Sequence, residues 1–379
     1  MAHKIGLVTW YDSYNYGTCL QCYALGKYLE NKGYDIYVIE NAKYYYGIKH
    51  PIDTLKKIIN KTNKSVKKTN KQVEISSELK RQFKVRRDKN HRFAYEENNI
   101  FYINSKKDYN KMLRLFDVFI TGSDQIWNPY FVSPTMLLAF TKRKHKKVAY
   151  ASSIGVSEIP SNLIKTYKKY LSRFNYIGVR EKTAKELIKS LINKDVETVV
   201  DPTFLLDGNY WNNFAKMHNE MIPHDKYIFC YFIGSSTMWY DDIKKFVNIN
   251  NMKIIIALSE SNIIPDFGEI VPNAGAADFI SFISNAAYVV TDSFHACALS
   301  INMNKEFVVY KRFADDSSSS QNSRIYDLLE LCKLTNRIID KNNNFENIIK
   351  EKIPYHIIND IVAINREQSE QYLSEAINS

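Results

Sequence analysis

Two loops carry the residue types that acid–base chemistry requires. The first, residues 121–129 with the sequence TGSDQIWNP, follows an apolar run and contains Asp124, whose carboxylate is suited to deprotonate an attacking hydroxyl group. The second, residues 289–295 with the sequence VVTDSFH, ends in His295, which can donate to a phosphate or pass a proton. A lone histidine is more often structural, but this one follows an apolar strand. Asp124 and His295 are therefore the predicted catalytic residues.

The same two loops hold candidate binding groups. Trp127 offers a flat apolar face on which a sugar ring can stack, and the alternative is a capped turn with a core tryptophan. In the second loop, hydroxyl groups stand at a predicted helix N-terminus, where free N–H groups bind anions. The predicted binding residues of the two loops are Ser123, Gln125, Trp127, Asn128, Thr291 and Ser293.

Further candidates lie outside these loops. Residues 15–17 form a glycine-bearing turn before a helix expected from about 18 to 31, and its N-terminus can bind an anion or hydroxyl group. Arg180 is expected either to hold a carboxylate or phosphate, or to pair with Glu181 at a domain junction. Two later arginines add positive charge within reach of the same phosphate. These binding candidates are Asn15, Tyr16, Gly17, Arg180, Arg312 and Arg324.

Several other chemistries are disfavoured. The turn at residues 15–17 lacks the G-x-G-x-x-G pattern, which argues against NAD or FAD. Cys19 and Cys22 form a C-x-x-C pair, but two ligands are too few for a structural zinc site, and small buried side chains are the favoured interpretation. No metal-ligand cluster is visible in the sequence. We therefore expect neither a metal nor a cofactor.

Parallel strands must position these loops. Short apolar runs alternate with helical stretches, which is typical of an α/β fold with two Rossmann-like domains. The expected strands are 4–9, 35–40, 118–121, 147–152, 176–179, 198–201, 227–233, 253–258, 288–291 and 307–310. The loops after them should meet around one cleft. We predict an N-terminal domain at residues 1–206, a C-terminal domain at 207–340 and a helical tail at 341–379.

The composition is that of a globular protein. The chain has 379 residues, of which 45% are hydrophobic and 25% charged, and this length favours two domains. No stretch approaches the roughly 18 apolar residues of a membrane span. The first residues, MAHKIGLVTW, do not have the pattern of an export signal. We therefore expect a cytoplasmic protein whose five cysteines are free thiols.

One segment accounts for the net charge of +11. Between Lys49 and Arg92, 15 Lys and Arg residues face four acids, an excess of 11, and we predict a basic helical insertion at about 46–95. Such a block indicates either contact with an anionic surface, such as the inner face of the plasma membrane, or a solvated insertion. Nucleic acid is disfavoured, because the block has no interleaved aromatic residues and no recognisable binding motif.

Taken in order, these motifs resemble those of the polysaccharide pyruvyltransferase family. The resemblance spans about residues 1–335 and skips the basic insertion. It implies a GT-B-like arrangement, with two Rossmann-like domains facing a central cleft. The matching pieces are NYGT at 15–18, LQ at 20–21, YAL at 23–25, GSDQIWNP at 122–129, ASSIG at 151–155, REKT at 180–183, DPT at 201–203, TDSFH at 291–295 and NSR at 322–324.

The resemblance implies transfer of pyruvate from phosphoenolpyruvate onto two sugar hydroxyl groups as a ketal, in capsular, exopolysaccharide or cell-wall glycan biosynthesis. Phosphoenolpyruvate would be a co-substrate on the C-terminal domain, and the N-terminal domain would hold a sugar or a lipid-linked oligosaccharide. Two departures occur. Ser293 stands where some members have arginine, and Ala296-Cys297 follows the histidine where glycine is usual. Phosphate binding would then depend on Arg180, Lys311, Arg312 or Arg324.

Two other functions fit the same loops. A nucleotide-sugar-dependent GT-B glycosyltransferase would use Asp124 as base and His295 at the leaving phosphate, but the sequence has no obvious segment that would bind a nucleobase. A non-catalytic glycan-binding relative would bind sugar without turning over any donor. A measurement of which donor is turned over, if any, distinguishes these two functions and pyruvyl transfer from one another.

Overall fold

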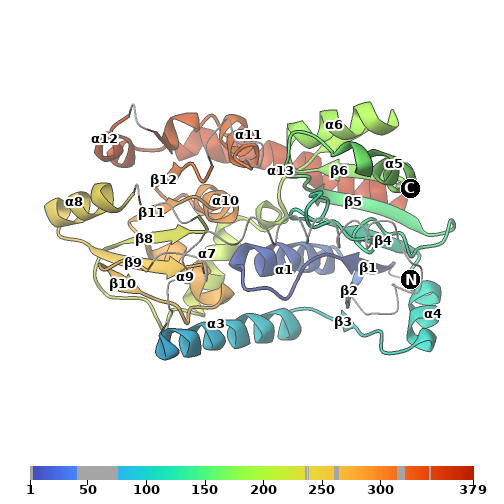
Figure 1. Cartoon of the computed structure of the whole chain (residues 1–379), viewed down its shortest axis with the longest axis horizontal. Coiled ribbons are helices and arrows are strands. Elements are labelled where there is room, and N and C mark those ends of the chain that lie inside the picture. The colour runs from blue at the N-terminus through green and yellow to red at the C-terminus, as the bar shows by residue number, and fades with distance from the viewer. Residues whose placement is uncertain are drawn as a thin grey trace.

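The helices and strands form two parallel-sheet units that lie side by side (Figure 1). The computed structural model describes residues 3–40, 76–234, 237, 239–259, 264–313, 321–340 and 343–379. Within these residues the strand order is β3-β2-β1-β4-β5-β6-β7 in the first sheet and β10-β9-β8-β11-β12-β13 in the second. Neighbouring strands pair in parallel, as β1 does with both β2 and β4. The predicted GT-B-like fold with two Rossmann-like domains is confirmed.

The first unit alternates strands and helices along its chain. Its central strand β4 is buried at all four positions, because helices and loops cover both faces of the sheet. The edge strands β3 and β7 have two residues each, too few for a periodic pattern. The elements are β1 (Lys4–Val8), α1 (Tyr16–Asn31), β2 (Asp35–Ile39), α3 (Ser77–Glu96), β3 (Ile100–Phe101), α4 (Lys106–Leu115), β4 (Val118–Thr121), β5 (Lys146–Ser152), α5 (Ser161–Leu171), β6 (Tyr176–Val179), α6 (Lys182–Ile192), β7 (Glu197–Thr198) and the 3₁₀ turn η2 (Pro202–Phe204).

The second unit repeats the pattern on a smaller scale. Its strand β8 is buried at every position and pairs with β9 and β11. The domain boundaries at 206 and 340 stay a prediction. The described strands of the first sheet all precede residue 206, and those of the second sheet all follow it. The elements are α7 (Gly208–Lys216), β8 (Tyr227–Phe232), α8 (Tyr240–Asn250), β9 (Lys253–Leu258), β10 (Glu269–Ile270), α9 (Ala276–Asn285), β11 (Tyr288–Thr291), α10 (Phe294–Asn302), β12 (Phe307–Tyr310), α11 (Ser323–Leu331), the 3₁₀ turn η3 (Thr335–Arg337), β13 (Ile338–Ile339), α12 (Phe345–Lys350) and α13 (Tyr355–Asn378).

The C-terminal helix α13 returns to the first unit. The Tyr372 hydroxyl donates to the carbonyl oxygen of Ala149 in β5 at 2.8 Å, and the Ser369 hydroxyl accepts from the amide of Val200 at 3.0 Å. The Tyr372 ring lies so close to Gly178 in β6 that a Cβ there would be 2.9 Å from ring carbons. The helical tail expected from the sequence therefore completes the core of the unit in which the chain began.

The basic insertion is described only in part, since residues 41–75 lie outside the described residues. Its described part is α3, which contacts both units (Figure 1). Arg86 is 2% exposed and donates to the carbonyl oxygen of Leu258 at the end of β9, and its Nη1 lies 3.4 Å from the Tyr16 hydroxyl. Asn90 donates to Ser13 in the first unit and accepts from Ala276 in the second. Helix α3 therefore links the two units through side chains that bond to both.

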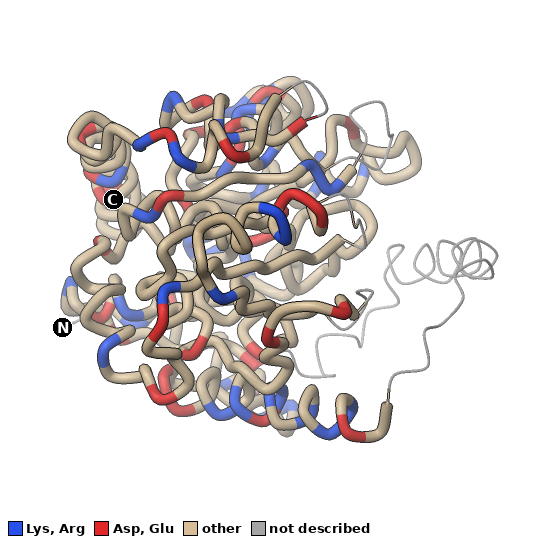
Figure 2. Tube along the Cα trace, turned by 90° about the vertical axis from the view of Figure 1, so that its left-hand side faces the viewer, with Lys and Arg blue, Asp and Glu red and all other residues tan. Residues whose placement is uncertain are grey.

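The outer face of α3 is basic. Figure 2 shows its Lys and Arg residues along the lower edge of the molecule. The exposed ones are Lys80, Arg81, Lys84, Arg87 and Arg92. One helix thus combines a buried arginine that joins the units with a solvent-facing row of positive charge.

Replacement of the buried arginine should weaken the junction between the units. We expect Arg86→Ala to lower the free energy of unfolding by about 2 kcal/mol, since the change leaves a buried carbonyl group without its charged donor. Urea denaturation measures this change. Lys84→Ala, on the exposed face of the same helix, is the control and should stay within about 0.5 kcal/mol of the wild type. Equal stability of the two variants would contradict the role of Arg86 in linking the units.

Candidate active site

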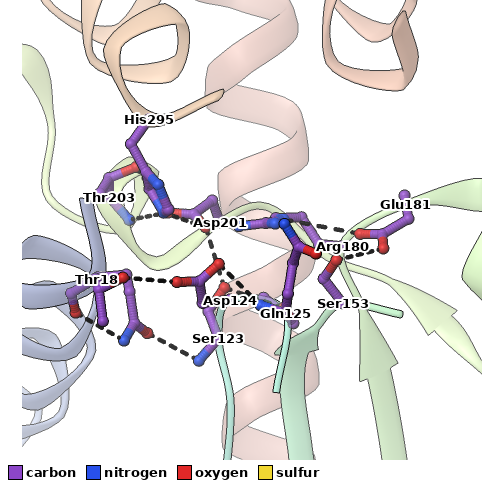
Figure 3. A network of polar contacts seen from close by, with 12 residues as sticks. Thr18, Ser123, Asp124, Gln125, Ser153, Arg180, Glu181, Asp201, Thr203 and His295 are labelled. Carbon is purple, nitrogen blue, oxygen red and sulfur yellow. Dashed lines mark hydrogen bonds and ion pairs between the residues drawn. The ribbon is translucent and has the colours of Figure 1, made fainter. Parts of the chain in front are cut away.

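Asp124 follows β4 and begins the turn that leads away from the first sheet. Its backbone has a φ of 65°, and its side chain is nearly buried, with 8% exposure. The Thr18 hydroxyl, in the first turn of α1, donates to Oδ2 at 2.8 Å (Figure 3). Burial raises the pKa of Asp124, but the charges of His295, Arg180 and Arg324 outweigh it and lower the pKa. Asp124 is therefore ionised at neutral pH and free to accept a proton.

The loop that carries Asp124 is fixed by glutamine and serine side chains. The Gln21 side chain donates to Thr9 and to the carbonyl oxygen of Trp10, and its Oε1 accepts from the amide of Ser123. The Ser123 hydroxyl lies 3.0 Å from both the Ala151 carbonyl oxygen and the Asp201 carboxylate. Ser123, predicted to bind substrate, is completely buried, so it positions the loop instead.

Asp201 is the buried centre of the site, and the sequence analysis did not select it. Its Oδ2 lies 2.9 Å from Nη1 of Arg180 and 3.6 Å from Nε2 of His295, while Oδ1 accepts from the amide and hydroxyl of Thr203 (Figure 3). Burial disfavours the charge, but His295 and Arg180 outweigh it and hold the pKa of Asp201 far below its usual range. The DPT segment at 201–203 contained this residue and the strand expected at 198–201 ended at it, but the observed strand β7 is Glu197–Thr198 and Asp201 caps the turn η2.

His295 reaches the network from the second unit, at the first turn of α10. It is 6% exposed, and within the described residues its Nε2 has no hydrogen-bond partner, because 3.6 Å to Asp201 is an ion-pair contact only. The ring lies directly against Gly17 in α1. A Cβ at position 17 would lie 2.1 Å from Nδ1, so only glycine leaves room for the histidine. The predicted pair Gly17 and His295 thus meets across the two units.

Arg180 is a buried cation with unused donors. Its guanidinium lies 4.0 Å from the ring centre of Phe294, next to His295, and pairs with Asp201 and more distantly with Glu181. Burial lowers the pKa of Arg180, but the charges of Asp201, Glu181 and Asp124 outweigh burial and raise the pKa above its usual value. The guanidinium is therefore always charged. Among the described residues, Nε and Nη2 have no hydrogen-bond partner. The pairing with Glu181 expected from the sequence is present, at 3.7 Å, and the binding of a carboxylate or phosphate by Arg180 stays a prediction.

Arg324 adds a second buried cation, 7% exposed, at the start of α11. Burial, together with the charges of Arg180 and Arg312, lowers its pKa to about 9. It donates to Gln321, and with the Gln125 amide in its other orientation, Oε1 of Gln125 lies 2.8 and 2.9 Å from Nη1 and Nη2. Two buried arginines near each other raise the local positive potential, which an anion would relieve.

A pocket of about 320 Å³ adjoins these arginines. Its wall includes Arg180 and Asp201 from the first unit and Phe294 and Arg324 from the second, and helix α13 closes one side through Asn365. The pocket is large enough for a small anionic molecule. Its lining also includes Glu197 and Thr198 of β7 and Asp327 of α11, and neither Asp124 nor His295 is part of it.

Several predicted binding residues are structural instead. Trp127 is completely buried, its ring packs against Phe174, and its indole nitrogen donates to the carbonyl oxygen of Met136. The prediction that Trp127 stacks on a sugar is therefore wrong; the alternative of a core tryptophan holds. Asn128, also fully buried, accepts from the amide of Tyr130 and lies 2.7 Å from the side-chain amide of Gln125.

Three residues of the other loops also have roles within the protein. Tyr16 is fully buried and stacks on Phe279 of α9, 4.6 Å between ring centres, so it joins the units and cannot contact substrate. Asn15 caps α1 by accepting from the amide of Gly17. Ser293 caps α10, with its hydroxyl 3.5 Å from the amide of Ala296.

The remaining residues of the histidine loop are held by backbone contacts. The Thr291 hydroxyl is buried, donates to the Tyr231 carbonyl and accepts from the amide of Ser293. Arg312 pairs with Asp292, which in turn accepts from the amides of Ile233 and Gly234. The Thr291 hydroxyl is therefore used within the protein, and Arg312 is held against Asp292, whereas Arg180 and Arg324 line the pocket and stay the candidate anion-binding residues.

Other chemistries gain no support from the described residues. Cys19 and Cys22 are buried free thiols, and burial raises the pKa of Cys19 to about 12. The described residues contain no group of three or more His, Cys, Asp or Glu side chains placed to hold a metal ion. No helix among them has both the length and the apolar character needed to cross a bilayer.

The fold and the site define a GT-B-like α/β enzyme in which two Rossmann-like units bring Asp124, His295 and two buried arginines together. The sequence matches the family described as polysaccharide pyruvyl transferase over residues 15–312. The chain belongs to this family, and it is a pyruvyltransferase. No curated protein gives a significant match to the sequence.

Several solved structures are similar to the chain. HepE from Anabaena, solved in complex with UDP, is similar with a TM-score of 0.53 and 10% sequence identity, over 99% of both chains. UDP-GlcNAc 2-epimerase from Neisseria meningitidis, bound to UDP-GlcNAc, has a TM-score of 0.46 at 10% identity, covering 98% of this chain and 100% of the other. MurG from Acinetobacter baumannii has a TM-score of 0.38 at 8% identity over 100% of both chains.

Loss of the central carboxylate should destabilise the protein in a pH-dependent manner. We expect Asp201→Asn to lower the free energy of unfolding at pH 7 by about 3 kcal/mol, because Arg180 would remain buried without its partner. Since the pKa of Asp201 is lowered in the folded state, the wild type loses this contribution as pH falls below about 4, where unfolded aspartate takes up protons.

The difference between the two proteins should therefore narrow from pH 7 to pH 3, as measured by urea denaturation. Glu330→Gln removes an exposed partner of Lys182 and is the control, with little effect at any pH. A difference that stays constant across this range would contradict an ionised, stabilising Asp201.

Proposed function

We propose that the protein transfers the pyruvyl group of phosphoenolpyruvate to two hydroxyl groups of a sugar as a ketal. The observation that carries the proposal is the meeting of Asp124, His295, Arg180 and Arg324 around Asp201. Family membership supplies the reaction class, pyruvyl transfer to a polysaccharide. The donor, the acceptor and the roles of the residues are the proposed parts.

The donor has two anionic groups, a phosphate and a carboxylate. Arg180 offers two donors that have no partner among the described residues, and Arg324 is a buried cation whose pKa is lowered to about 9 by burial and by the neighbouring arginines. Binding of a dianion between them would relieve this repulsion, and guanidinium groups suit planar or tetrahedral oxyanions. Both arginines line the pocket of about 320 Å³.

The chemistry requires one acid and one base. In the proposed mechanism, His295 gives a proton to the methylene carbon of phosphoenolpyruvate, which makes C2 electrophilic. Asp124 takes the proton of the first sugar hydroxyl group as its oxygen attacks C2. The C2–phosphate bond then breaks, the second hydroxyl oxygen closes the ketal, and its proton leaves with the phosphate. Asp124 then passes the proton of the first hydroxyl group to His295, which had given its own proton to the methylene carbon, and both side chains return to their starting states.

Asp201 has a positioning role in this proposal. Its carboxylate contacts both His295 and Arg180, which would act on the two ends of the same donor. The Asp201 carboxylate lies 3.6 Å from Nε2 of His295 and so fixes the imidazole in place for the first step. Gly17 fixes the ring from the opposite side.

Substitution of the acid and the base tests the mechanism. We expect His295→Ala to abolish phosphate release from phosphoenolpyruvate, and Asp124→Asn to slow it by on the order of 10²–10⁴, the range for loss of a positioned acid or base. The assay uses a panel of galactose-, mannose- and glucose-containing acceptors. His356→Ala, an exposed histidine on α13, is the control and should retain full activity.

Three results would contradict the proposal. Activity in a folded His295→Ala protein would remove this residue from the mechanism. Release of a nucleotide from a nucleotide-sugar, without phosphate release from phosphoenolpyruvate, would favour the glycosyltransferase alternative. Retention of glycan with no turnover of either donor would favour a non-catalytic binding protein.

We also propose that the acceptor is assembled on a lipid carrier, as capsular and cell-wall glycans commonly are, and that basic side chains hold the enzyme at the inner membrane surface. The exposed row on α3 supports this part of the proposal, since each basic residue near an anionic surface contributes about 1 kcal/mol. Lysines 56, 57, 67 and 68 belong to the same basic block but lie outside the described residues.

Charge reversal on α3 tests the membrane contact. We expect the wild type to sediment with anionic vesicles at low ionic strength and to be released at about 0.5 M salt, because screening then acts within a few ångströms. Combined replacement of Lys80, Lys84 and Arg87 by Glu should weaken sedimentation. The matched control places Glu at Lys168 and Lys169, two exposed residues of α5. Equal binding to neutral and anionic vesicles would contradict an electrostatic contact.

A further inference from the structure

One of the buried arginines of the site is held by neutral groups. The guanidinium of Arg324 donates to the side chain of Gln321 at 3.1 Å, and its Nη1 and Nη2 lie 2.8 and 2.9 Å from the side-chain amide of Gln125. Among the described residues Arg324 forms no ion pair, whereas Arg180 pairs with Asp201 at 2.9 Å. A buried charge without a counter-charge is costly, and this cost is recovered when an anion binds.

The two carboxylates that act on Arg324 are engaged with other donors. Asp124 accepts from the Thr18 hydroxyl, and Glu181 accepts from the Ser153 hydroxyl and from the two backbone amides that follow it. Both carboxylates raise the pKa of Arg324, but burial and the neighbouring arginines outweigh them and lower it to about 9. The positive charge of Arg324 is therefore left without a close partner of opposite charge in the part of the chain that the structure describes.

The side chain of Gln125 occupies a place that would suit a carboxylate. One of its two terminal atoms lies 2.8 and 2.9 Å from the Arg324 guanidinium nitrogens, and the other lies 2.7 Å from Nδ2 of Asn128. Because Oδ1 of Asn128 accepts from the amide of Tyr130, its Nδ2 faces Gln125. Both terminal atoms of Gln125 therefore face donors. An amide, which has one oxygen, satisfies only one of them, whereas a carboxylate would satisfy both.

The shape of this place does not exclude glutamate. Gly155 has a φ of 67°, and a Cβ there would lie 2.7 Å from Oε1 of Gln125, so the glycine leaves room for the glutamine side chain. Glutamate has the same shape as glutamine and would fit in the same room. It would also supply the counter-charge that Arg324 lacks, which would stabilise the protein in the absence of a ligand. A neutral residue thus stands where a charged one would fit.

The neutral residue leaves the charge of Arg324 available to a ligand. Gln125 directly follows Asp124 in the first unit (Figure 3), whereas Arg324 belongs to α11 of the second unit. Arg324 and Arg180 both line the pocket of about 320 Å³. An amide oxygen orients a guanidinium by accepting its hydrogen bonds, but it does not neutralise the charge.

We propose that Gln125 is a positioning residue that makes the pocket selective for an anion, because its amide orients Arg324 across the two units without neutralising it. The inference rests on the proposed function, in which phosphoenolpyruvate is the anion bound by Arg180 and Arg324. It assigns to Gln125, expected from the sequence to bind substrate, an action through the arginine.

Anion binding and stability, measured on the full chain, test the inference without catalysis. The probes are inorganic phosphate and phosphoenolpyruvate in titration calorimetry, and urea denaturation without ligand gives the stability. We expect Gln125→Glu to weaken binding of both anions at least about tenfold, because its carboxylate competes with the ligand for Arg324. The same variant should unfold at a higher urea concentration than the wild type. This combination of higher stability and weaker binding is not expected from a loss of packing.

Two further variants complete the comparison. Gln125→Met keeps a similar shape and leaves Arg324 charged but without its oxygen partner, so it should unfold at a lower urea concentration and lose only about threefold in anion affinity. Gln371→Glu makes the same chemical change as Gln125→Glu on the exposed face of α13 and is the matched control. It should match the wild type in both measurements.

The other outcomes separate this inference from the proposed function. Unchanged anion binding in Gln125→Glu would overturn the inference, and so would weaker binding together with lower stability, which would indicate disrupted packing. Failure of the wild type to bind either anion would overturn it as well. Binding of inorganic phosphate that Gln125→Glu loses, with no binding of phosphoenolpyruvate by either protein, would support the inference and contradict the proposed donor.

Discussion

The buried carboxylate of Asp201 holds the two halves of the site together. It belongs to the first unit, yet its strongest neighbours include the imidazole that α10 of the second unit supplies. A buried carboxylate that pairs with Arg180 is stable only if further donors satisfy its remaining lone pairs, and Ser123 and Thr203 supply them. The arrangement of Arg180 beneath Phe294 follows from this pairing, because the guanidinium is anchored at one end and stacked along its face.

Two further contacts set the orientation in which this network can form. Tyr16 projects from the start of α1 and stacks on Phe279, and Arg86 reaches from α3 to the end of β9. Both lie beside the turn that contains Gly17. Since the ring of His295 rests on that glycine, a small rotation of one unit would separate the histidine from Asp201. The same few residues therefore determine both the packing between the units and the geometry of the site.

The sequence predicted the central strands and the two loops that carry Asp124 and His295, because polar residues after apolar runs mark the carboxyl ends of parallel strands. It did not predict which side chains of those loops face inward. Trp127 and Asn128 stand beside Asp124 in sequence but are fully buried, a difference set by tertiary packing that a loop without periodicity cannot reveal. Asp201 was expected only as the last residue of a strand at 198–201, whereas β7 is Glu197–Thr198. Its importance comes from partners far away in the chain, which no local pattern reveals.

The return of α13 has a consequence for the order in which the protein is built. The surfaces of β5 and β6 around Ala149 and Gly178 are covered by Tyr372, which follows the entire second unit in the sequence. On a ribosome, the first sheet therefore emerges long before its covering helix and must wait with an apolar face uncovered. The second unit, whose strands are all made in the interval, can complete its own sheet first. The N-terminal unit, although synthesised first, is thus among the last parts of the protein to reach its final packing.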